Sequence, residues 1–314
     1  AAGARGVREP DAQVELDAVR RVQAELAATL DPDQTIATLE KLLVPNLAEL
    51  CTIDLAEADG EPHLHGASID ITALNRAEAA LQEGNYQEAI TLFEQLAQGV
   101  ERSTQLELNA RVLLLSMAYT GRARALAGMQ EYAAAEEDFA KVLTDQPNYL
   151  PALIARGQMY LEAGSPDQAL TDFESAVKLQ RTNLDALFGL GKSYIQLGGN
   201  QQGVRALSQV LEAQPENAEA YRLRGTGQAG LLKFQEAISD LDKAISLDPQ
   251  DYEAYFLLGI VYLRMEDYQR SVEELGKAIE HYKPKQGMED QPFAKGYLTR
   301  AAVYVELGKA AKEE

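Results

Sequence analysis

The chain has 314 residues, of which 49 are acidic and 29 basic, giving a formal net charge of −20. Such an acidic surface repels phosphate backbones and anionic lipid, which argues against a nucleic-acid partner. No apolar run reaches the roughly 20 residues of a membrane-spanning helix, so we expect no membrane insertion. The single cysteine, Cys51, fits a reducing compartment. We therefore expect a cytoplasmic protein or, because the sequence begins at Ala1 without Met, one exported after removal of a leader.

Residues 1–69 differ in pattern from the rest of the chain. Apolar periodicity predicts helices over residues 11–30 and 35–43. Alternating residues predict two short strands, 50–55 and 62–65, on either side of a turn. Because a two-stranded ribbon is marginally stable alone, this segment packs on the adjoining part of the chain, pairs with another chain or is partly disordered.

Part of this segment is similar to a known fold. Residues 30–66, LDPDQTIATLEKLLVPNLAELCTIDLAEADGEPHLHG, resemble the beginning of a GAF domain, a small-molecule sensor fold of signalling proteins. The strands that would complete the ligand pocket are absent, because a different pattern begins near Ile71. The resemblance therefore implies no ligand-binding function for this segment.

From residue 70 onward, one pattern returns with a period of about 34 residues. It is clearest over Ala218–Asp251, where two predicted helices, residues 218–231 and 234–246, are followed by Pro249, which cannot continue a helix. A small residue recurs in the first helices, at Ala123, Gly157, Gly191, Gly225 and Gly259. Another recurs in the second helices, at Ala135, Ala169, Gly203, Ala237 and Ser271. Small residues at fixed places predict that the two helices of each pair approach closely.

The period divides the rest of the chain into six repeats and part of a seventh. The predicted bounds are 70–103, 104–149, 150–183, 184–217, 218–251, 252–285 and 293–314. The equivalent aromatics Tyr86 and Tyr132 are further apart than one period, because an extra segment lies at 104–115. This insert is rich in leucine and has no glycine or proline. We expect it to lengthen the first helix of the second repeat by about three turns, with a loop as the alternative.

The pattern resembles the tetratricopeptide repeat family, whose unit is a helix-turn-helix of about 34 residues. The resemblance covers roughly residues 70–314. It implies an all-α fold, a right-handed α-solenoid, preceded by the small N-terminal helical or hairpin segment of residues 1–69. Each repeat of a solenoid buries its apolar face only against its neighbours. Because the last repeat is cut short at residues 309–314, we expect one apolar face to be open there, through truncation or because another molecule covers it.

The resemblance also implies which residues line the inner, partner-binding surface, because inward-facing side chains hold fixed places in each first helix. On this chain those places include Arg124, Ile154, Gln158, Leu161, Phe188, Lys192, Ile195, Arg222, Phe256, Ile260, Leu263, Arg264 and Leu298. Five of them are expected to form an exposed apolar stripe, namely Phe188, Ile195, Phe256, Ile260 and Leu263. Exposed patches of this kind mark interaction sites.

We hypothesise that an amphipathic segment of another protein lies in this groove. Its apolar side would cover the stripe, and its acidic groups would contact Lys192, Arg222 and Arg264. The alternative is that the inner residues pack on neighbouring helices or on the N-terminal segment. The sequence thus predicts a non-enzymatic protein-interaction scaffold. The second hypothesis is a signalling adaptor whose GAF-like segment senses a ligand or dimerises.

Other motifs do not predict chemistry. The sequence GLGKS at residues 189–193 resembles the end of a phosphate loop, but Ala186 stands where that loop needs glycine. His63 and His65 lack the ligand spacing of a structural zinc site. Acidic residues of the second helices, Asp138 among them, are expected on the solvated outer face. We predict no cofactor, no metal and no catalytic residue, and leave open a homo-oligomer through the incomplete C-terminal repeat or the N-terminal segment.

Overall fold

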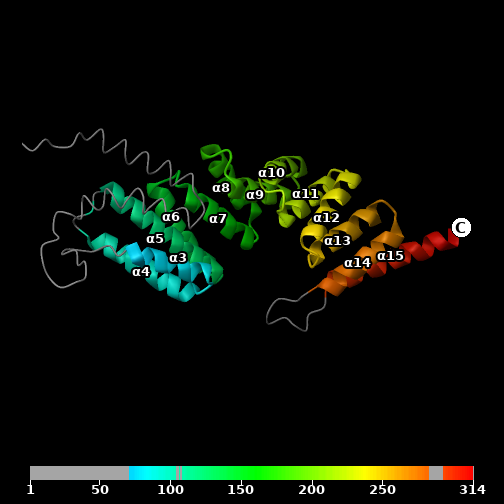
Figure 1. Cartoon of the computed structure of the whole chain (residues 1–314), viewed down its shortest axis with the longest axis horizontal. Helices are drawn as coiled ribbons and strands as arrows, with labels where there is room; N and C mark the ends of the chain where they lie inside the picture. Colours follow the sequence, from blue (N-terminus) through cyan, green and yellow to red (C-terminus); the bar gives the residue numbers. More distant parts are fainter. Residues whose placement is uncertain (1–70, 104–105, 107, 283–292, 314) are drawn as a thin grey trace, which may run out of the picture. The chain divides into compact units, whose positions relative to one another are not determined.

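The computed structural model describes residues 71–103, 106, 108–282 and 293–313. Within these ranges it consists of thirteen α-helices and no strand (Figure 1), so the predicted all-α fold of the repeats is confirmed. None of the described helices combines the length and the apolar character needed to cross a membrane. The helices, hairpin and GAF-like segment predicted for residues 1–69 lie outside the described residues.

The described residues divide into two compact units, the first ending at Met159 and the second beginning at Tyr160. In the first unit, α3 pairs with α4, α4 with α5, and α5 with α6. The described helices of this unit are α3 (Ile71–Gln82), α4 (Tyr86–Arg102), α5 (Leu108–Gly128), α6 (Tyr132–Asp145) and the first part of α7 (Leu150–Glu162).

The core of the first unit lies where α3, α4 and α5 meet. Phe93 of α4 is fully buried, in one cluster with Ala77 of α3 and Ala118 of α5. The ring of Phe93 fills the space beside Gly121, where an added Cβ would lie only 2.2 Å from it. A side chain at residue 121 would therefore force the two helices apart.

Helix α5 is the long helix of the first unit. It has 21 residues, whereas the first helices α7, α9, α11 and α13 have 13 each. It begins at Leu108, slightly later than the start at residue 104 that we predicted from the inserted segment. The buried residues of α5 lie between Ser116 and Ala127, so its N-terminal two turns extend beyond the buried part.

In the second unit each helix pairs with the next along the chain, from α8 to α15. Its helices are α8 (Pro166–Leu179), α9 (Leu184–Gln196), α10 (Asn200–Ala213), α11 (Ala218–Gly230), α12 (Phe234–Leu247), α13 (Tyr252–Arg264), α14 (Tyr268–His281) and α15 (Ala294–Glu313). The first helices are also neighbours, because α11 contacts both α9 and α13. Side chains of three first helices thus meet on one side of this unit.

Small residues let the two helices of a repeat approach closely, as the sequence predicts. In the sixth repeat, a Cβ added at Gly259 would lie 2.7 Å from Cγ of Leu275, which is fully buried. In the fifth repeat, a Cβ at Gly225 would lie 3.0 Å from Cγ of Leu241 and 3.2 Å from the Ala237 carbonyl oxygen. The glycine of the first helix therefore receives the large residue of the second.

The turn between the two helices of a repeat uses one position in the left-handed backbone region. Gly164 and Gly198 hold it with φ of +74° and +79°. Gln130, Leu232 and Glu266 hold the same position in other repeats, with φ of 62° to 64°. Only glycine adopts this conformation without steric cost, so these three turns carry local strain.

Capping side chains fix where several first helices begin. Asn183 accepts a hydrogen bond from the backbone N–H of Ala186 at 2.8 Å, and Asn217 accepts one from Ala220 at 2.9 Å. Asp251 holds the same position before α13 and accepts from the N–H of Ala254 at 3.1 Å. Because these residues satisfy otherwise unpaired N–H groups, each typically stabilises its helix by about 1 kcal/mol.

Candidate functional site

The predicted inner residues of the first unit differ in exposure: two are exposed and one is buried. Arg124 on α5 is exposed, and its guanidinium lies 3.1 Å from the Glu78 carboxylate of α3. Gln158 on α7 is exposed, but Ile154 is only 4% exposed. Ile154 therefore belongs to the core, which differs from the inner-surface position implied by the family resemblance.

In the second unit, the predicted residues gather on the neighbouring helices α9, α11 and α13 and on α15. Leu161 lies on α7 and is not counted among them. We call the others the first-helix face: Phe188, Lys192, Ile195, Arg222, Phe256, Ile260, Leu263, Arg264 and Leu298. Arg264 and Leu298 are exposed, and most of the others, like Leu161, are half-buried. The face is thus accessible in part, and less apolar at its surface than the sequence suggested.

Two members of the predicted apolar stripe, Phe256 and Ile195, pack against other residues of the chain. Phe256 is 8% exposed, because the ring of Phe293 lies edge-on to it at 5.3 Å and the Lys295 ammonium lies 5.0 Å from its ring centre. Ile195 fills the space left by two glycines, since a Cβ at Gly203 or Gly227 would lie 2.6 or 2.5 Å from its Cδ1. The expectation of a continuous exposed stripe is therefore wrong at Phe256, and Ile195 is only half-exposed.

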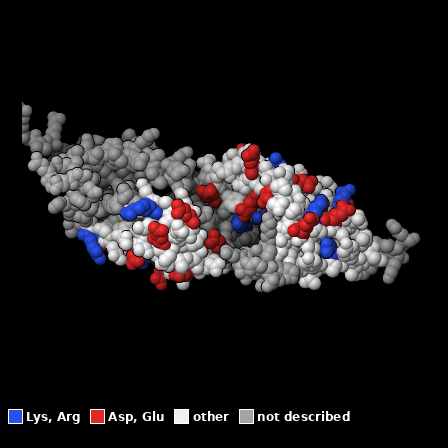
Figure 2. All heavy atoms as spheres, turned by 60° about the horizontal axis from the view of Figure 1, so that its bottom comes forward, with Lys and Arg blue, Asp and Glu red and all other residues white. Residues whose placement is uncertain are grey.

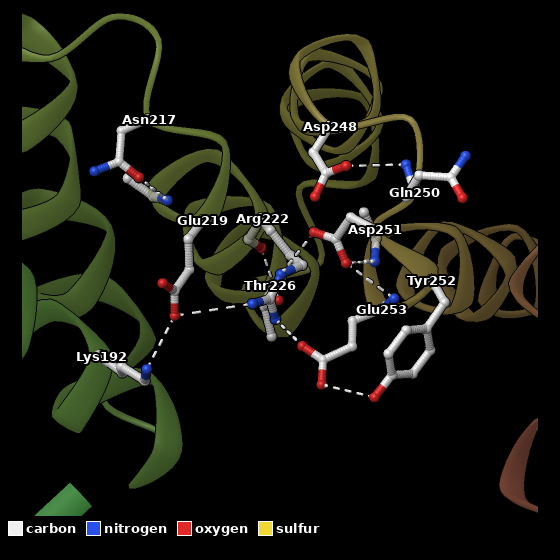
Figure 3. A network of polar contacts seen from close by, with 12 residues as sticks. Lys192, Asn217, Glu219, Arg222, Thr226, Asp248, Gln250, Asp251, Tyr252 and Glu253 are labelled. Carbon is white, nitrogen blue, oxygen red and sulfur yellow. Dashed lines mark hydrogen bonds and ion pairs between the residues drawn. The ribbon is translucent and has the colours of Figure 1, made fainter. Parts of the chain in front are cut away.

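A network of charged side chains crosses the first-helix face (Figure 3). Its centre is Arg222 of α11, which forms ion pairs with Glu219 at 3.8 Å, with Asp251 at 3.0 Å and with Glu253. Glu219 also accepts a hydrogen bond from the Lys192 ammonium of α9 at 2.9 Å. The network joins three successive first helices, α9, α11 and α13.

The network is tied to the start of α13. The Asp251 side chain pairs with Arg222 through one oxygen, Oδ2, and caps α13 through the other, Oδ1. The side chains of Asp251 and Arg222 are only 14% and 18% exposed. Their pairing is less screened by water than that of surface residues, and the capping bonds hold the carboxylate in place.

The other cations of this face also have partners. The Lys192 ammonium lies 5.9 Å from the ring centre of Phe188, one turn earlier on α9. Arg264 of α13 donates a hydrogen bond to the carbonyl oxygen of Ala229, near the C-terminus of α11, at 3.3 Å. A helix C-terminus carries partial negative charge, so this position suits a guanidinium.

These contacts correct the predicted chemistry of the face. We expected Lys192, Arg222 and Arg264 to receive acidic groups of a partner, but Arg222 is already surrounded by carboxylates. Two of these carboxylates are more accessible than the guanidinium, with Glu219 42% and Glu253 48% exposed against 18% for Arg222. In Figure 3 the second oxygen of Glu219 has no contact with the other residues drawn. The accessible charged groups around Arg222 are therefore carboxylates, and they lie beside half-buried apolar side chains.

Acidic and basic side chains are interspersed on one face of the described part of the molecule. Figure 2 shows one face on which red acidic and blue basic groups lie next to one another. Its described part carries no broad basic surface of the kind that nucleic-acid binding uses. Among the described residues, no group of three or more His, Cys, Asp or Glu side chains could hold a metal ion.

Two buried ion pairs recur at one place in the repeat, and sequence reasoning missed them. Arg122 donates two hydrogen bonds to Asp138, at 2.6 and 2.7 Å, and Arg224 donates two to Asp240, at 2.7 and 2.8 Å. Asp138 is 2% exposed, so its expected place on the solvated outer face is wrong. The hydrogen bonds to the carboxylates raise the pKa of both arginines. The signal that could have revealed the pairs is the constant spacing of 16 between the arginine of a first helix and the aspartate of the second.

Comparison with known proteins agrees with the repeat architecture. Four family models described as tetratricopeptide repeats match residues 120–187, 160–226, 233–266 and 252–281. Among curated proteins, the mitochondrial import receptor subunit TOM70 of Homo sapiens is 28% identical over 117 residues. That match spans 37% of this chain and only 19% of the length of the receptor subunit.

Solved structures of related architecture include two that match about half of this chain. MamA residues 41 to the end, from Desulfovibrio magneticus RS-1, is 21% identical, with a TM-score of 0.49, over 55% of this chain and 97% of that one. YrrB, described as a TPR protein with an unusual peptide-binding site, is 23% identical, with a TM-score of 0.46, over 55% of this chain and 88% of that one.

The repeat unit is recognisable both in the sequence and in the packing of the helices. The matched residues contain the helix pairs α9 with α10, α11 with α12 and α13 with α14, and the small-residue contacts between them. Both the spacing and the packing are those of helix-turn-helix repeats of about 34 residues. The chain is therefore a member of the tetratricopeptide repeat family.

Proposed function

We propose that the first-helix face of the second unit binds a segment of a partner protein that has apolar anchors flanked by basic residues. Tetratricopeptide repeats are protein-interaction scaffolds, and the repeats of residues 120–281 make this chain one. The proposal adds which face is used and which chemistry the partner presents.

The apolar part of the proposal is supported by side chains that the chain covers incompletely. Phe188, Ile260 and Leu263 are half-buried, and Leu298 is 72% exposed. Phe188 lies on α9, and Ile260 and Leu263 lie on α13, two of the helices that the charged network joins; Leu298 lies on α15. Apolar side chains left partly in water gain free energy when a partner covers them, by about 25 cal/mol for each Å² of apolar surface removed.

The basic part is supported by the arrangement around Arg222. Its guanidinium contacts Glu219, Asp251 and Glu253, so it has little capacity left for a carboxylate from outside. Glu219 and Glu253 remain about half exposed. Together with the net charge of −20, these carboxylates favour a partner with Lys or Arg and speed its association. The position of Arg222 among carboxylates is the observation on which the proposal depends.

Selection from a random phage-displayed peptide library tests the proposal on the full chain. We expect enrichment of peptides that combine Leu, Ile or Phe with Lys or Arg. For synthetic versions of the selected peptides, the double variant Glu219→Gln with Glu253→Gln should weaken binding several-fold at low salt and less at high salt.

The matched control is Glu236→Gln, which removes an exposed carboxylate from the second helix α12. It should leave peptide affinity unchanged, because it lies on another part of the repeat. Enrichment of acidic peptides, or equal loss of affinity in the control and the double variant, would contradict the proposed chemistry of the face.

A further inference from the structure

Each first helix of the fourth, fifth and sixth repeats has a carboxylate at its second residue. These residues are Asp185 of α9, Glu219 of α11 and Glu253 of α13, and we call them the carboxylate row. Asp185 is exposed, and the side chains of Glu219 and Glu253 are 42% and 48% exposed. Accessible carboxylates therefore recur at one place in three successive repeats.

The carboxylate row lies along one edge of the first-helix face. The helices α9, α11 and α13 run in the same direction, because each is joined to the next by a second helix that packs against both after a short turn. Their N-termini, which carry the row, therefore lie on the same side of the unit. Since α11 contacts both α9 and α13, the row crosses neighbouring helices without a gap.

The apolar side chains of the face lie further along the same helices. Phe188 follows Asp185 by three residues, and Ile260 and Leu263 follow Glu253 by seven and ten. At a rise of about 1.5 Å per residue, the apolar groups extend to about 15 Å from the row. A segment that crosses the three helices would thus meet carboxylates along one side and half-buried apolar groups along the other.

The edge that carries the row stays negative although two cations lie beside it. Lys192 and Arg222 both contact Glu219, and Arg222 also pairs with Glu253 and with Asp251. Asp185 has no ion-pair partner among the residues that the structure describes. Two cations therefore face four carboxylates, and the second oxygen of Glu219 is without a contact to the residues drawn in Figure 3.

The spacing of the row decides which backbone conformation can match it. Helices packed side by side lie about 8–10 Å apart, so successive carboxylates of the row are separated by about that distance. In an α-helix, residues i and i+7 lie on the same side and about 10.5 Å apart along the axis. In an extended segment, residues about 10 Å apart are three positions apart and point to opposite sides. A helix therefore matches the row, and an extended segment does not.

We propose that the first-helix face of the second unit binds an amphipathic α-helix of a partner protein, in which Lys or Arg recurs every seven residues beside a stripe of Leu, Ile or Phe. This helix would lie across α9, α11 and α13, with its cations on the carboxylate row and its stripe on Phe188, Ile260 and Leu263. The inference rests on the proposed function of this face, and it adds the conformation of the partner and the spacing of its basic residues.

Two synthetic peptides of the same composition test the spacing. Both are alanine-rich, have about 18 residues and carry leucines at i+1, i+5, i+8 and i+12, which form one helical stripe. The matched peptide has lysines at i, i+7 and i+14, beside the stripe. The clustered peptide has them at i+3, i+4 and i+7, within about one turn. Fluorescence anisotropy with the full chain at low salt should show about tenfold tighter binding of the matched peptide, because two more lysines reach a carboxylate at about threefold each.

Substitutions in the row assign the lysines. Asp185→Asn, Glu219→Gln and Glu253→Gln should each weaken binding of the matched peptide about threefold. Each effect should vanish when one lysine of the peptide is replaced by glutamine, the middle lysine for Glu219 and the two outer lysines for the other variants. Glu212→Gln, at an exposed carboxylate of the second helix α10, is the matched control and should change the affinity of both peptides equally.

Proline tests the conformation. Proline at i+6 of the matched peptide breaks a helix but is tolerated in an extended segment, so it should abolish binding. Equal affinity of the matched and clustered peptides, undiminished binding of the proline peptide, or row substitutions without effect would overturn the inference.

These outcomes are separate from those of the peptide library. If library peptides with apolar and basic residues bind but the matched peptide does not, the inference of a helix with heptad-spaced cations is wrong and the proposed function stands. If the library yields no such peptide and neither synthetic peptide binds, both are overturned.

Discussion

The buried pair of Arg224 and Asp240 provides the sharpest test of the packing described above. Asp240→Ala removes a carboxylate that is 8% exposed and that accepts two hydrogen bonds at 2.7 and 2.8 Å. Breaking a fully buried ion pair costs about 3–5 kcal/mol, whereas an exposed pair contributes about 0–1 kcal/mol. Arg224 is 21% exposed and keeps its contact with Ser208, so we expect an intermediate loss of about 2–3 kcal/mol.

The assay is denaturation in urea followed by circular dichroism, with hydrogen exchange of the α11 and α12 amides to locate the loss. Asp242→Ala, two residues further along α12 and exposed, is the control. Partial loss of hydration, and secondarily the charge of Glu274, raises the pKa of Asp242, so its charge is not stabilised by its surroundings and its removal should change stability by less than about 0.5 kcal/mol. Equal effects of Asp240→Ala and Asp242→Ala would refute the reasoning.

Local geometry leads to three further predictions. Leu232→Gly should raise stability by about 0.5–1 kcal/mol in thermal unfolding, because φ is +62° there, whereas Gln235→Gly, at an exposed position within α12, should lower it. Gly259→Val should lower the free energy of unfolding by about 1–3 kcal/mol, because a Cβ at residue 259 would lie 2.7 Å from the buried Leu275; the urea midpoint measures the loss. An unchanged midpoint would show that the helices can separate freely. Burial and then the hydrogen bond to Glu101 raise the pKa of Tyr119 from 10.0 to about 12, so its contribution to stability is full below pH 10 and falls as the pH rises to about 12. Tyr119→Phe should remove that fall, measured as the pH dependence of the urea midpoint, and an identical pH profile in the variant would exclude Tyr119 as its source.

The fold of the repeats could be predicted from sequence because each repeat presents the same packing problem. Gly191, Gly225 and Gly259 recur where two helices must approach, and the recurrence at a fixed period is visible without any structure. Side chains that depart from the consensus are harder to place. Ile195 is drawn inward because Gly203 and Gly227 leave space for it, and neither glycine would be noticed from residue 195 alone.

The electrostatics of the site were the least predictable part. Arg222 has the expected place on its helix, yet its partners Asp251 and Glu253 come from the start of α13, with the whole of α12 between them in the sequence. Position within a repeat indicates that a residue faces inward. Position alone does not indicate whether a side chain of a neighbouring repeat already pairs with the charge of that residue. That can be decided only from the distance between the two helices.

The charged network also implies an order of separation among the repeats of the second unit. Dissolved ions weaken the Lys192–Glu219 contact first, because its side chains are 32% and 42% exposed, whereas the contact of Arg222 with Asp251 is sheltered. Raising ionic strength should therefore loosen the contact of α9 with α11 before that of α11 with the capped start of α13. Under such conditions the repeats would separate first between α9 and α11 instead of unfolding progressively from the ends of the array.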